Sequence, residues 1–313
     1  MKNFVLESIK KIQDAINKNK LVLFIGAGVS TNSGLPNWKE LIDNFSESIG
    51  KKANNYSDKD YLRIPQYYYN ERGKKEYYDV ITKIFAGEYK PNLIHELLLD
   101  LNPIHIITTN FDNLLEQMVR IKGEFFDVVK QNSDLPYTPN SRMIIKMHGD
   151  LELKNIILKE DDFLSYSNNF ILIENFIKSL FATHVILFVG YSLNDPDVQL
   201  IFQWIKDILK EDFQPAYFLK IDKEKSEKED RIDFEYYKKK GINILYYSAI
   251  EELTKNFEVK SRNFSELLIL NSDIGRKLYK FLKLIKEYEV KFKNITDMFY
   301  EKLQIFDMLN SIR

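Results

Sequence analysis

Short apolar runs recur along the chain, and several of them end in glycine or in small polar residues. In the first, at 21–29, five apolar residues lead into two glycines, which is typical of a buried parallel strand that ends in a tight turn. Helix-like stretches separate most of the runs, and this alternation predicts an α/β fold with a parallel sheet covered on both faces. The other strand-like runs lie at 105–110, 143–149, 184–192, 215–221 and 242–248.

Two further regions are predicted to be helical. Roughly the first 18 residues carry apolar side chains at helical spacing, which indicates an amphipathic helix. An insert between the first two strands, about 38–100, is rich in Tyr, Lys and Asn, and we expect it to form a small helical lobe over the edge of the sheet. The apolar residues of the N-terminal helix are Phe4, Val5, Ile9, Ile12 and Ile16.

The C-terminal segment shows a different pattern. Its apolar residues step by three or four, as in the seam of a heptad repeat. One helix over 274–313 would be roughly 60 Å long at 1.5 Å per residue. Either a pair of helices folds against the body, or the segment forms an arm for self-association or partner binding. We therefore divide the chain into a main α/β domain, 1–255, and a C-terminal helical segment, 256–313. The apolar positions are Leu278, Phe281, Ile285, Tyr288, Phe292, Ile295 and Phe299.

Composition and charge exclude several classes of function. The 313 residues include 45 basic and 46 acidic groups, so the net charge of −1 disfavours direct nucleic-acid binding, although it leaves room for a local basic patch. The chain has no cysteine, which excludes disulfides, a thiolate nucleophile and Cys-ligated zinc. With four scattered histidines, we also expect no metal site. The absence of a secretory signal and of long apolar runs predicts a soluble, cytoplasmic protein without membrane contact.

Two glycine-containing motifs follow strand-like runs. In 26–36 (GAGVSTNSGLP), Gly26 and Gly28 let a ligand approach the backbone, and the turn opens onto a helix N-terminus whose amides favour phosphate. In 189–197 (VGYSLNDPD), Gly190 and Ser192 can donate to a phosphate or a ribose. Either motif by itself is equally compatible with a simple turn.

Two polar motifs also lie at strand ends. Asn110 and Asp112 follow the strand in 108–112 (TTNFD), although Asp112 can instead form an Asx turn that caps the next helix. His148 ends the strand in 146–152 (KMHGDLE), where it is either a general base with a near-neutral pKa or a structural histidine. Because ligands of open α/β sheets bind at the carboxyl ends of the strands, we expect all four motifs to converge on one cleft.

In this order, GAGVS…GLP, TTNFD, KMHGD and GYSLND resemble the sirtuin family over about residues 18–250. The similarity is closer to a zinc-free bacterial branch that supplies effectors to anti-phage systems such as Thoeris. The resemblance implies a Rossmann-like fold that binds NAD⁺ across the sheet edge, with Asn110 and His148 as the catalytic pair. It implies that the phosphate and nicotinamide side is contacted by Gly26, Ala27, Gly28 and Ser30. It also implies that Asp112 lies beside the nicotinamide amide, and that Gly190 and Ser192 contact the adenosine half.

The sequence departs from protein-deacylating sirtuins at two points. Those enzymes carry a four-Cys zinc ribbon, and they have an Asp-Phe-Arg run after the proline where this chain has Asn37 and Trp38. The resemblance therefore favours an NAD⁺ glycohydrolase that releases nicotinamide and ADP-ribose, or its cyclic form, as an abortive-infection effector. We expect activation in a homo-oligomer or in a complex with an operon-encoded sensor or ATPase. The alternatives are a deacylase or ADP-ribosyltransferase, and a non-catalytic NAD⁺ or ADP-ribose sensor.

Overall fold

A computed structural model describes most of the chain. The described residues are 1–50, 57, 60–139, 142–192, 201, 203–204, 215–221, 227–259, 270 and 272–288. Residues 193–197 of the last glycine motif and residues 289–313 of the predicted C-terminal helix lie outside them.

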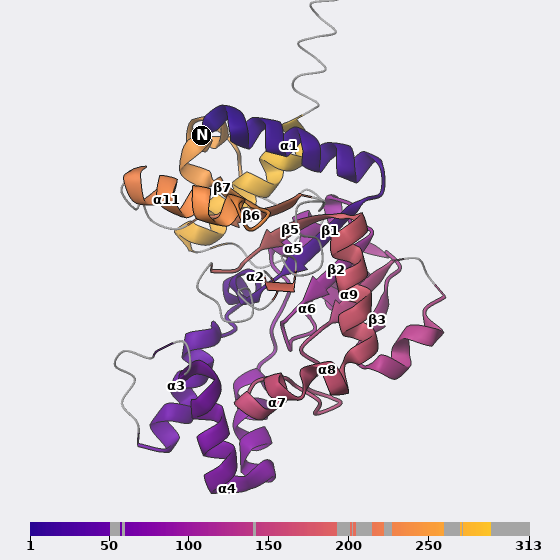
Figure 1. The fold of residues 1–313 in the computed structure, drawn as a ribbon, viewed down its shortest axis with the longest axis vertical. Coiled ribbons are helices and arrows are strands. Elements are labelled where there is room, and N and C mark those ends of the chain that lie inside the picture. The colour runs from indigo at the N-terminus through magenta and orange to yellow at the C-terminus, as the bar shows by residue number, and fades with distance from the viewer. Residues whose placement is uncertain are drawn as a thin grey trace, which may run out of the picture.

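The centre of the fold is a parallel seven-stranded sheet with the order β3-β4-β2-β1-β5-β6-β7 (Figure 1). The predicted parallel α/β fold is confirmed, and all six predicted strands are present. The pattern missed β3, an edge strand of three residues that is only half-buried and therefore has no continuous apolar run. The strands are β1 (Leu21–Ile25), β2 (His105–Thr108), β3 (Asp127–Val129), β4 (Met143–Lys146), β5 (Val185–Val189), β6 (Ala216–Lys220) and β7 (Ile242–Tyr246).

Helices cover both faces of the sheet. Along β1, Leu21, Leu23 and Ile25 enter one hydrophobic cluster, and Val22 and Phe24 enter another, because successive side chains of a strand point to opposite faces. The first cluster includes residues of α1 (Lys2–Asn17), α5 (Leu93–Asp100) and α6 (Leu114–Lys122). The second includes residues of α8 (Tyr166–Asn169), α9 (Ile171–Thr183) and α11 (Glu227–Lys238).

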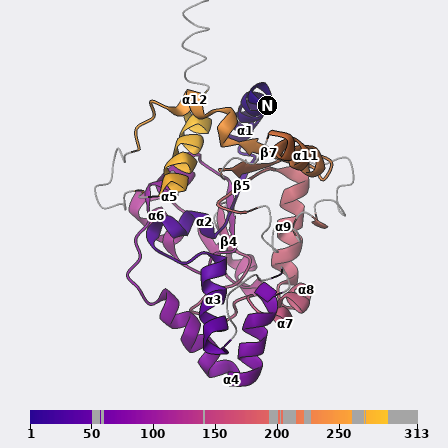
Figure 2. The ribbon, with the colours of Figure 1, turned by 90° about the vertical axis from the view of Figure 1, so that its left-hand side faces the viewer.

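A helical lobe projects from one end of the sheet (Figures 1 and 2). It contains α3 (Trp38–Ser48) and α4 (Asp60–Phe85), which share a hydrophobic cluster around Phe45 and Tyr77. The ion pair between Arg63 and Glu160 of α7 (Glu160–Leu164), at 3.0 Å, links the lobe to the rest of the molecule. The last helix of the predicted insert, α5, packs against the sheet and not in this lobe. The remaining short elements are α2 (Ala27–Ser30), η1 (Thr31–Ser33), η2 (Asn132–Tyr137), η3 (Tyr247–Ala249) and α12 (Glu251–Thr254).

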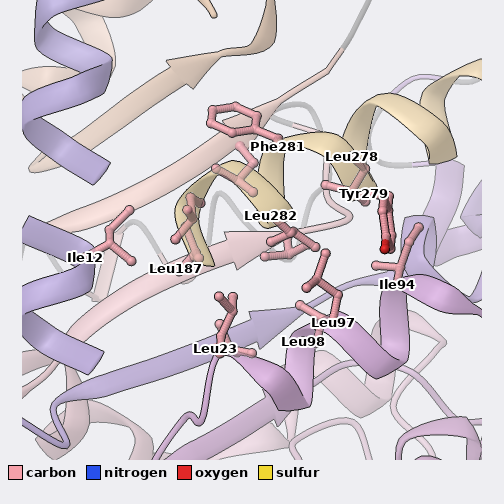
Figure 3. Close-up of a cluster of buried hydrophobic side chains, with 14 of the residues drawn as sticks. Ile12, Leu23, Ile94, Leu97, Leu98, Leu187, Leu278, Tyr279, Phe281 and Leu282 are labelled. Atoms are coloured by element: carbon pink, nitrogen blue, oxygen red, sulfur yellow. The ribbon is translucent and has the colours of Figure 1, made fainter. Parts of the chain in front are cut away.

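A helix over 273–288 packs against the face of the sheet that also holds α1 and α5. Figure 3 shows Leu278, Tyr279, Phe281 and Leu282 of this helix among side chains of α5 and of the strands. These four side chains are at least nine-tenths buried. For the described residues of the C-terminal segment, the structure therefore shows a helix folded against the body.

Candidate active site

Four strand ends meet where the topology of the sheet changes direction. β1 is central, with β2 on one side and β5 on the other. The chain leaves the carboxyl ends of these strands toward opposite sides, and a crevice at such a switch point is the usual ligand site of open α/β sheets. The pairing of Thr108 with Lys146 also brings the segments after β2 and β4 next to each other.

The two glycines after β1 are required by a close approach of two loops. The Gly28 N–H donates to the Gly190 carbonyl at 2.8 Å, and the Gly26 N–H donates to the Val189 carbonyl at 2.9 Å. A Cβ at position 28 would lie 2.7 Å from the Gly190 oxygen, and one at position 26 would lie 2.8 Å from it. The sequence suggested free amides for a phosphate, but both of these N–H groups are already used to join the loops after β1 and β5.

Asn110 is held in one orientation by its amide nitrogen. Nδ2 donates to Ser30 Oγ at 3.0 Å and to the Gly26 carbonyl at 3.3 Å. Its Oδ1 is buried and accepts no hydrogen bond from the residues that the structure describes. Since an unsatisfied buried acceptor is costly, this oxygen suits a donor supplied by a ligand, such as a ribose hydroxyl or a water.

Asn110 lines a first cavity together with Ser30 and Asp112. Asp112 Oδ1 accepts the Leu114 N–H at 3.0 Å at the start of α6, so the predicted Asx cap is present alongside its place in the cavity. Burial raises the pKa of Asp112, although hydrogen bonds from the Leu114 N–H and the Ser30 hydroxyl oppose the shift. The rest of the lining is mostly apolar and comprises Ala27, Leu35, Pro36, Asn37, Trp38, Leu41, Phe85, Thr109 and Phe111.

A second cavity adjoins the first. The two share Ala27, Asn37 and Trp38 in their linings, so Trp38 lies where they meet. Of the predicted adenosine-side residues, Gly190 and Ser192 both line the second cavity, as does Gly28. Its other walls come from Tyr191, Leu219, Ile221, Ile274 and Leu278.

The departure from the deacylase pattern at Asn37 and Trp38 has a structural role. Asn37 Oδ1 accepts the Glu40 N–H at 3.0 Å, and the Asn37 N–H donates to Glu40 Oε2 at 2.8 Å. This reciprocal capping box starts α3. The Trp38 indole N–H is buried and finds no acceptor among the described residues, so it is a second unused polar group in a residue that lines both cavities.

His148 lies two residues after β4 and is almost fully buried. Its ring makes edge contacts with Phe163 and Tyr166, at centroid distances of 5.5 and 6.3 Å. Burial lowers the pKa of His148 to about 3, below the near-neutral value on which the general-base interpretation of the sequence depends. The lining of the cavity next to Asn110 does not include His148. The structure thus brings the two backbone segments together but directs the imidazole toward an aromatic cluster.

Lys146 was missed by the sequence analysis, although a lysine within the apolar run of β4 was a visible signal. Its buried Nζ donates to the carbonyl oxygens of Phe111 and Asp112, at 3.0 and 2.8 Å, and to Asp150 Oδ2 at 2.7 Å. It also lies 3.4 Å from Glu116 Oε1. Lys146 therefore fastens the loop after Asn110 to the loop after His148.

The carboxylates around Lys146 respond in opposite ways. Burial alone would raise the pKa of Asp150, but the ammonium groups of Lys146 and Lys130 together outweigh it and hold that pKa below its ordinary value. Burial raises the pKa of Glu116, and Lys146 offsets only part of the effect.

Within the described ranges, no three His, Asp or Glu side chains are placed to hold a metal ion. No described helix combines the length and the apolar character needed to cross a membrane.

Comparisons with known proteins point to one family. Residues 104–245 match the SIR2-like domain family. Over 249 residues the chain is 38% identical to defense-associated sirtuin 2 of Bacillus subtilis, covering 78% of this chain and 24% of the relative. It is 28% identical over 278 residues to the NAD(+) hydrolase ThsA of Enterococcus faecium, covering 80% of this chain and 58% of the relative. The chain thus spans between about a quarter and somewhat over half the length of these two relatives. A crystal structure of a Sir2 homolog–NAD complex is 14% identical with a TM-score of 0.44, covering 89% and 94% of the two chains.

Proposed function

Residues 104–245 match the SIR2-like domain family, and from this premise we propose that the chain is an NAD⁺ glycohydrolase that cleaves the bond between nicotinamide and ribose. The products are nicotinamide and ADP-ribose, or the cyclic form if an adenine nitrogen replaces water. The observation that carries the proposal is the buried Asn110 Oδ1, an unused acceptor in a cavity at the carboxyl end of β2.

In this proposal each of the two adjoining cavities takes one half of the dinucleotide. The nicotinamide and its ribose occupy the cavity lined by Ser30, Asn110 and Asp112, and the adenosine half occupies the cavity lined by Gly190 and Ser192. A cationic nicotinamide ring becomes neutral as it leaves, and a mostly apolar wall solvates the neutral product better than the cation. Such a wall thus favours bond cleavage.

Cleavage of this bond depends more on positioning the ribose and the nucleophile than on acid catalysis, because nicotinamide is already a cationic leaving group. Ser30 and the Gly26 carbonyl fix the Asn110 amide, so that Oδ1 is left to orient a ribose hydroxyl or the attacking water. His148 is neutral at physiological pH, since its pKa is about 3. In the proposed reaction it takes the proton from water or ribose, which requires the filled site to raise this pKa.

The relatives also suggest a biological role. One is named a defense-associated sirtuin and another an NAD(+) hydrolase. We propose that this chain acts in anti-phage defence by depleting NAD⁺, as an abortive-infection effector in the cytoplasm. Unrestrained NAD⁺ hydrolysis would kill the host, so activity is switched on in a homo-oligomer or by an operon-encoded sensor or ATPase. Light scattering of the chain, alone and with the neighbouring gene products, tests this assembly.

The direct test is NAD⁺ turnover by the purified chain, alone and with its neighbouring gene product, with nicotinamide and ADP-ribose quantified by chromatography. Asn110→Ala should lower turnover by about 100-fold or more, the scale of a lost positioning group. The matched control is Asn113→Ala, an exposed asparagine three residues away that lies outside the first cavity's lining. Equal turnover in both variants would refute the role of Asn110.

The same assay separates the alternatives. A deacylase or ADP-ribosyltransferase would consume NAD⁺ only with an acylated or acceptor protein. A sensor would bind NAD⁺ without cleaving it, even with the partner present. Either result would replace the glycohydrolase proposal.

A further inference from the structure

A hydrogen-bonded chain connects the start of the 273–288 helix to the glycine turn. Ser272 Oγ donates to Asn32 Oδ1 at 2.7 Å and accepts the Gly275 N–H at 2.9 Å, so it is also the cap of this helix. Asn32 Nδ2 in turn donates to the Gly28 carbonyl at 3.0 Å. Asn32 therefore joins two segments that lie 240 residues apart in the sequence, and both of them line the second cavity.

The contact is closer than any side chain at position 275 would allow. Gly275 is buried against Asn32, and a Cβ built on it would overlap the Asn32 Oδ1 atom. The Gly28 carbonyl also accepts the Thr31 hydroxyl at 3.1 Å. The glycine turn is thus held from within by Thr31 and from the C-terminal helix through Asn32.

The same helix turn contributes an apolar wall to the second cavity. Ile274 and Leu278 line it together with Gly28 and Gly190. Leu278 is anchored in the core, whereas Ile274 remains 56% exposed (Figure 3 shows Leu278). An exposed isoleucine at the edge of a cavity offers a flat aromatic ligand an apolar surface to cover.

We propose that the first turn of the C-terminal helix is part of the dinucleotide pocket, with Ile274 packing on the adenosine half and Asn32–Ser272 acting as a positioning pair for the glycine turn. This inference rests on the proposed function, which supplies the dinucleotide. It makes the C-terminal helix a determinant of nucleotide affinity. Because coupling between sites is reciprocal, nucleotide binding must also fasten this helix to the body.

The test of the wall is Ile274→Asp, measured by calorimetric titration of ADP-ribose into the full chain. A charged carboxylate in place of the apolar surface that packs on the adenosine half should weaken binding about tenfold or more. The control is Ile232→Asp, since Ile232 is 61% exposed and lines neither of the two pocket cavities. Neither change should shift the unfolding midpoint, because both side chains are exposed.

Ser272→Asp tests the positioning pair. Aspartate still caps the helix by accepting the Gly275 N–H, but it cannot donate to Asn32. We expect KM for NAD⁺ to rise about threefold to tenfold in this variant, whereas Ser272→Thr, which keeps the donor, restores it. Adding Asn32→Ala to Ser272→Asp should cost little more, since the pair acts as one unit.

The outcomes distinguish the two proposals. If wild type binds ADP-ribose and both Ile274→Asp and Ser272→Asp match it, the inference is wrong and the proposed function survives. If wild type binds and Ile274→Asp does not, but NAD⁺ is never cleaved, the inference stands and the hydrolase proposal falls. If wild type binds neither NAD⁺ nor ADP-ribose, both fall.

Discussion

Replacing Lys146 with methionine removes a buried positive charge while keeping a side chain of similar length. In the wild type the side chain is 1% exposed, and its Nζ donates to two carbonyls of the loop after Asn110 and to Asp150. Glu116 lies within ion-pair distance of the same nitrogen. The change therefore leaves two buried carboxyl groups and two carbonyls without this donor.

The expected loss of stability follows from these contacts. Removing one partner of a buried ion pair costs about 3–5 kcal/mol, because the other charge stays buried. Asp150 keeps a second cation, Lys130 at 3.1 Å, so we expect the lower end of this range, about 3 kcal/mol. Methionine fills most of the space, so a cavity adds little.

The loss should depend on pH. Lys146 helps to hold the pKa of Asp150 below its ordinary value, and that stabilisation is present above the unfolded pKa of about 3.9 and is lost as the pH falls through the folded value. Without the ammonium group the pKa values of Asp150 and Glu116 rise. Protonation then relieves the buried charges, so the gap between wild type and variant should narrow from pH 7.5 to pH 5.

Urea denaturation followed by circular dichroism at both pH values measures this gap. Lys130→Met is the matched control: its side chain is 24% exposed, and it pairs with Asp150 and Glu152. We expect it to cost about 1 kcal/mol, as partly exposed pairs do. A Lys146→Met loss no larger than that of Lys130→Met, or one that is constant with pH, would refute the reasoning. NAD⁺ turnover should also fall in Lys146→Met, because the loop after Asn110 loses its anchor.

Two further predictions concern a loop glycine and a buried histidine. Gly149 has a φ of +76°, and a Cβ there would overlap the Asn155 carbonyl. Gly149→Ala should therefore lower the melting temperature more than Gly123→Ala, because Gly123 has a φ of +65° but no atom near its Cβ position. Equal shifts would show that only the backbone strain of a positive φ matters. Burial lowers the pKa of His95 to about 3, below its unfolded value, so its neutral form stabilises the fold above about pH 6.5 and this contribution is lost as the pH falls. His95→Gln can keep the capping contact to Asn92 and should flatten the stability profile between pH 6.5 and 5 by up to about 1.4 kcal/mol per pH unit. An unchanged slope in urea titrations would show that His95 is not buried as a neutral group.

The local pattern of apolar residues determined most of the fold. Six strands are apolar runs of four or five residues that are buried on both faces, and such runs can be recognised without knowledge of their neighbours. The half-buried β3 lacked that signal. Asn110, Asp112 and His148 could be placed at one sheet edge because parallel strands end on the same side.

Only the tertiary structure decided how the side chains at that edge are used. The sequence could not show that the amides of Gly26 and Gly28 donate to the last residue of β5 and to the residue after it, or that the imidazole of His148 packs among aromatic rings. The contact of Asn32 with Ser272 was equally hidden. The physical reason is the same in each case: local propensity sets which element forms, whereas hydrogen bonding, burial and pKa depend on neighbours that are distant in the sequence and become known only when the chain packs.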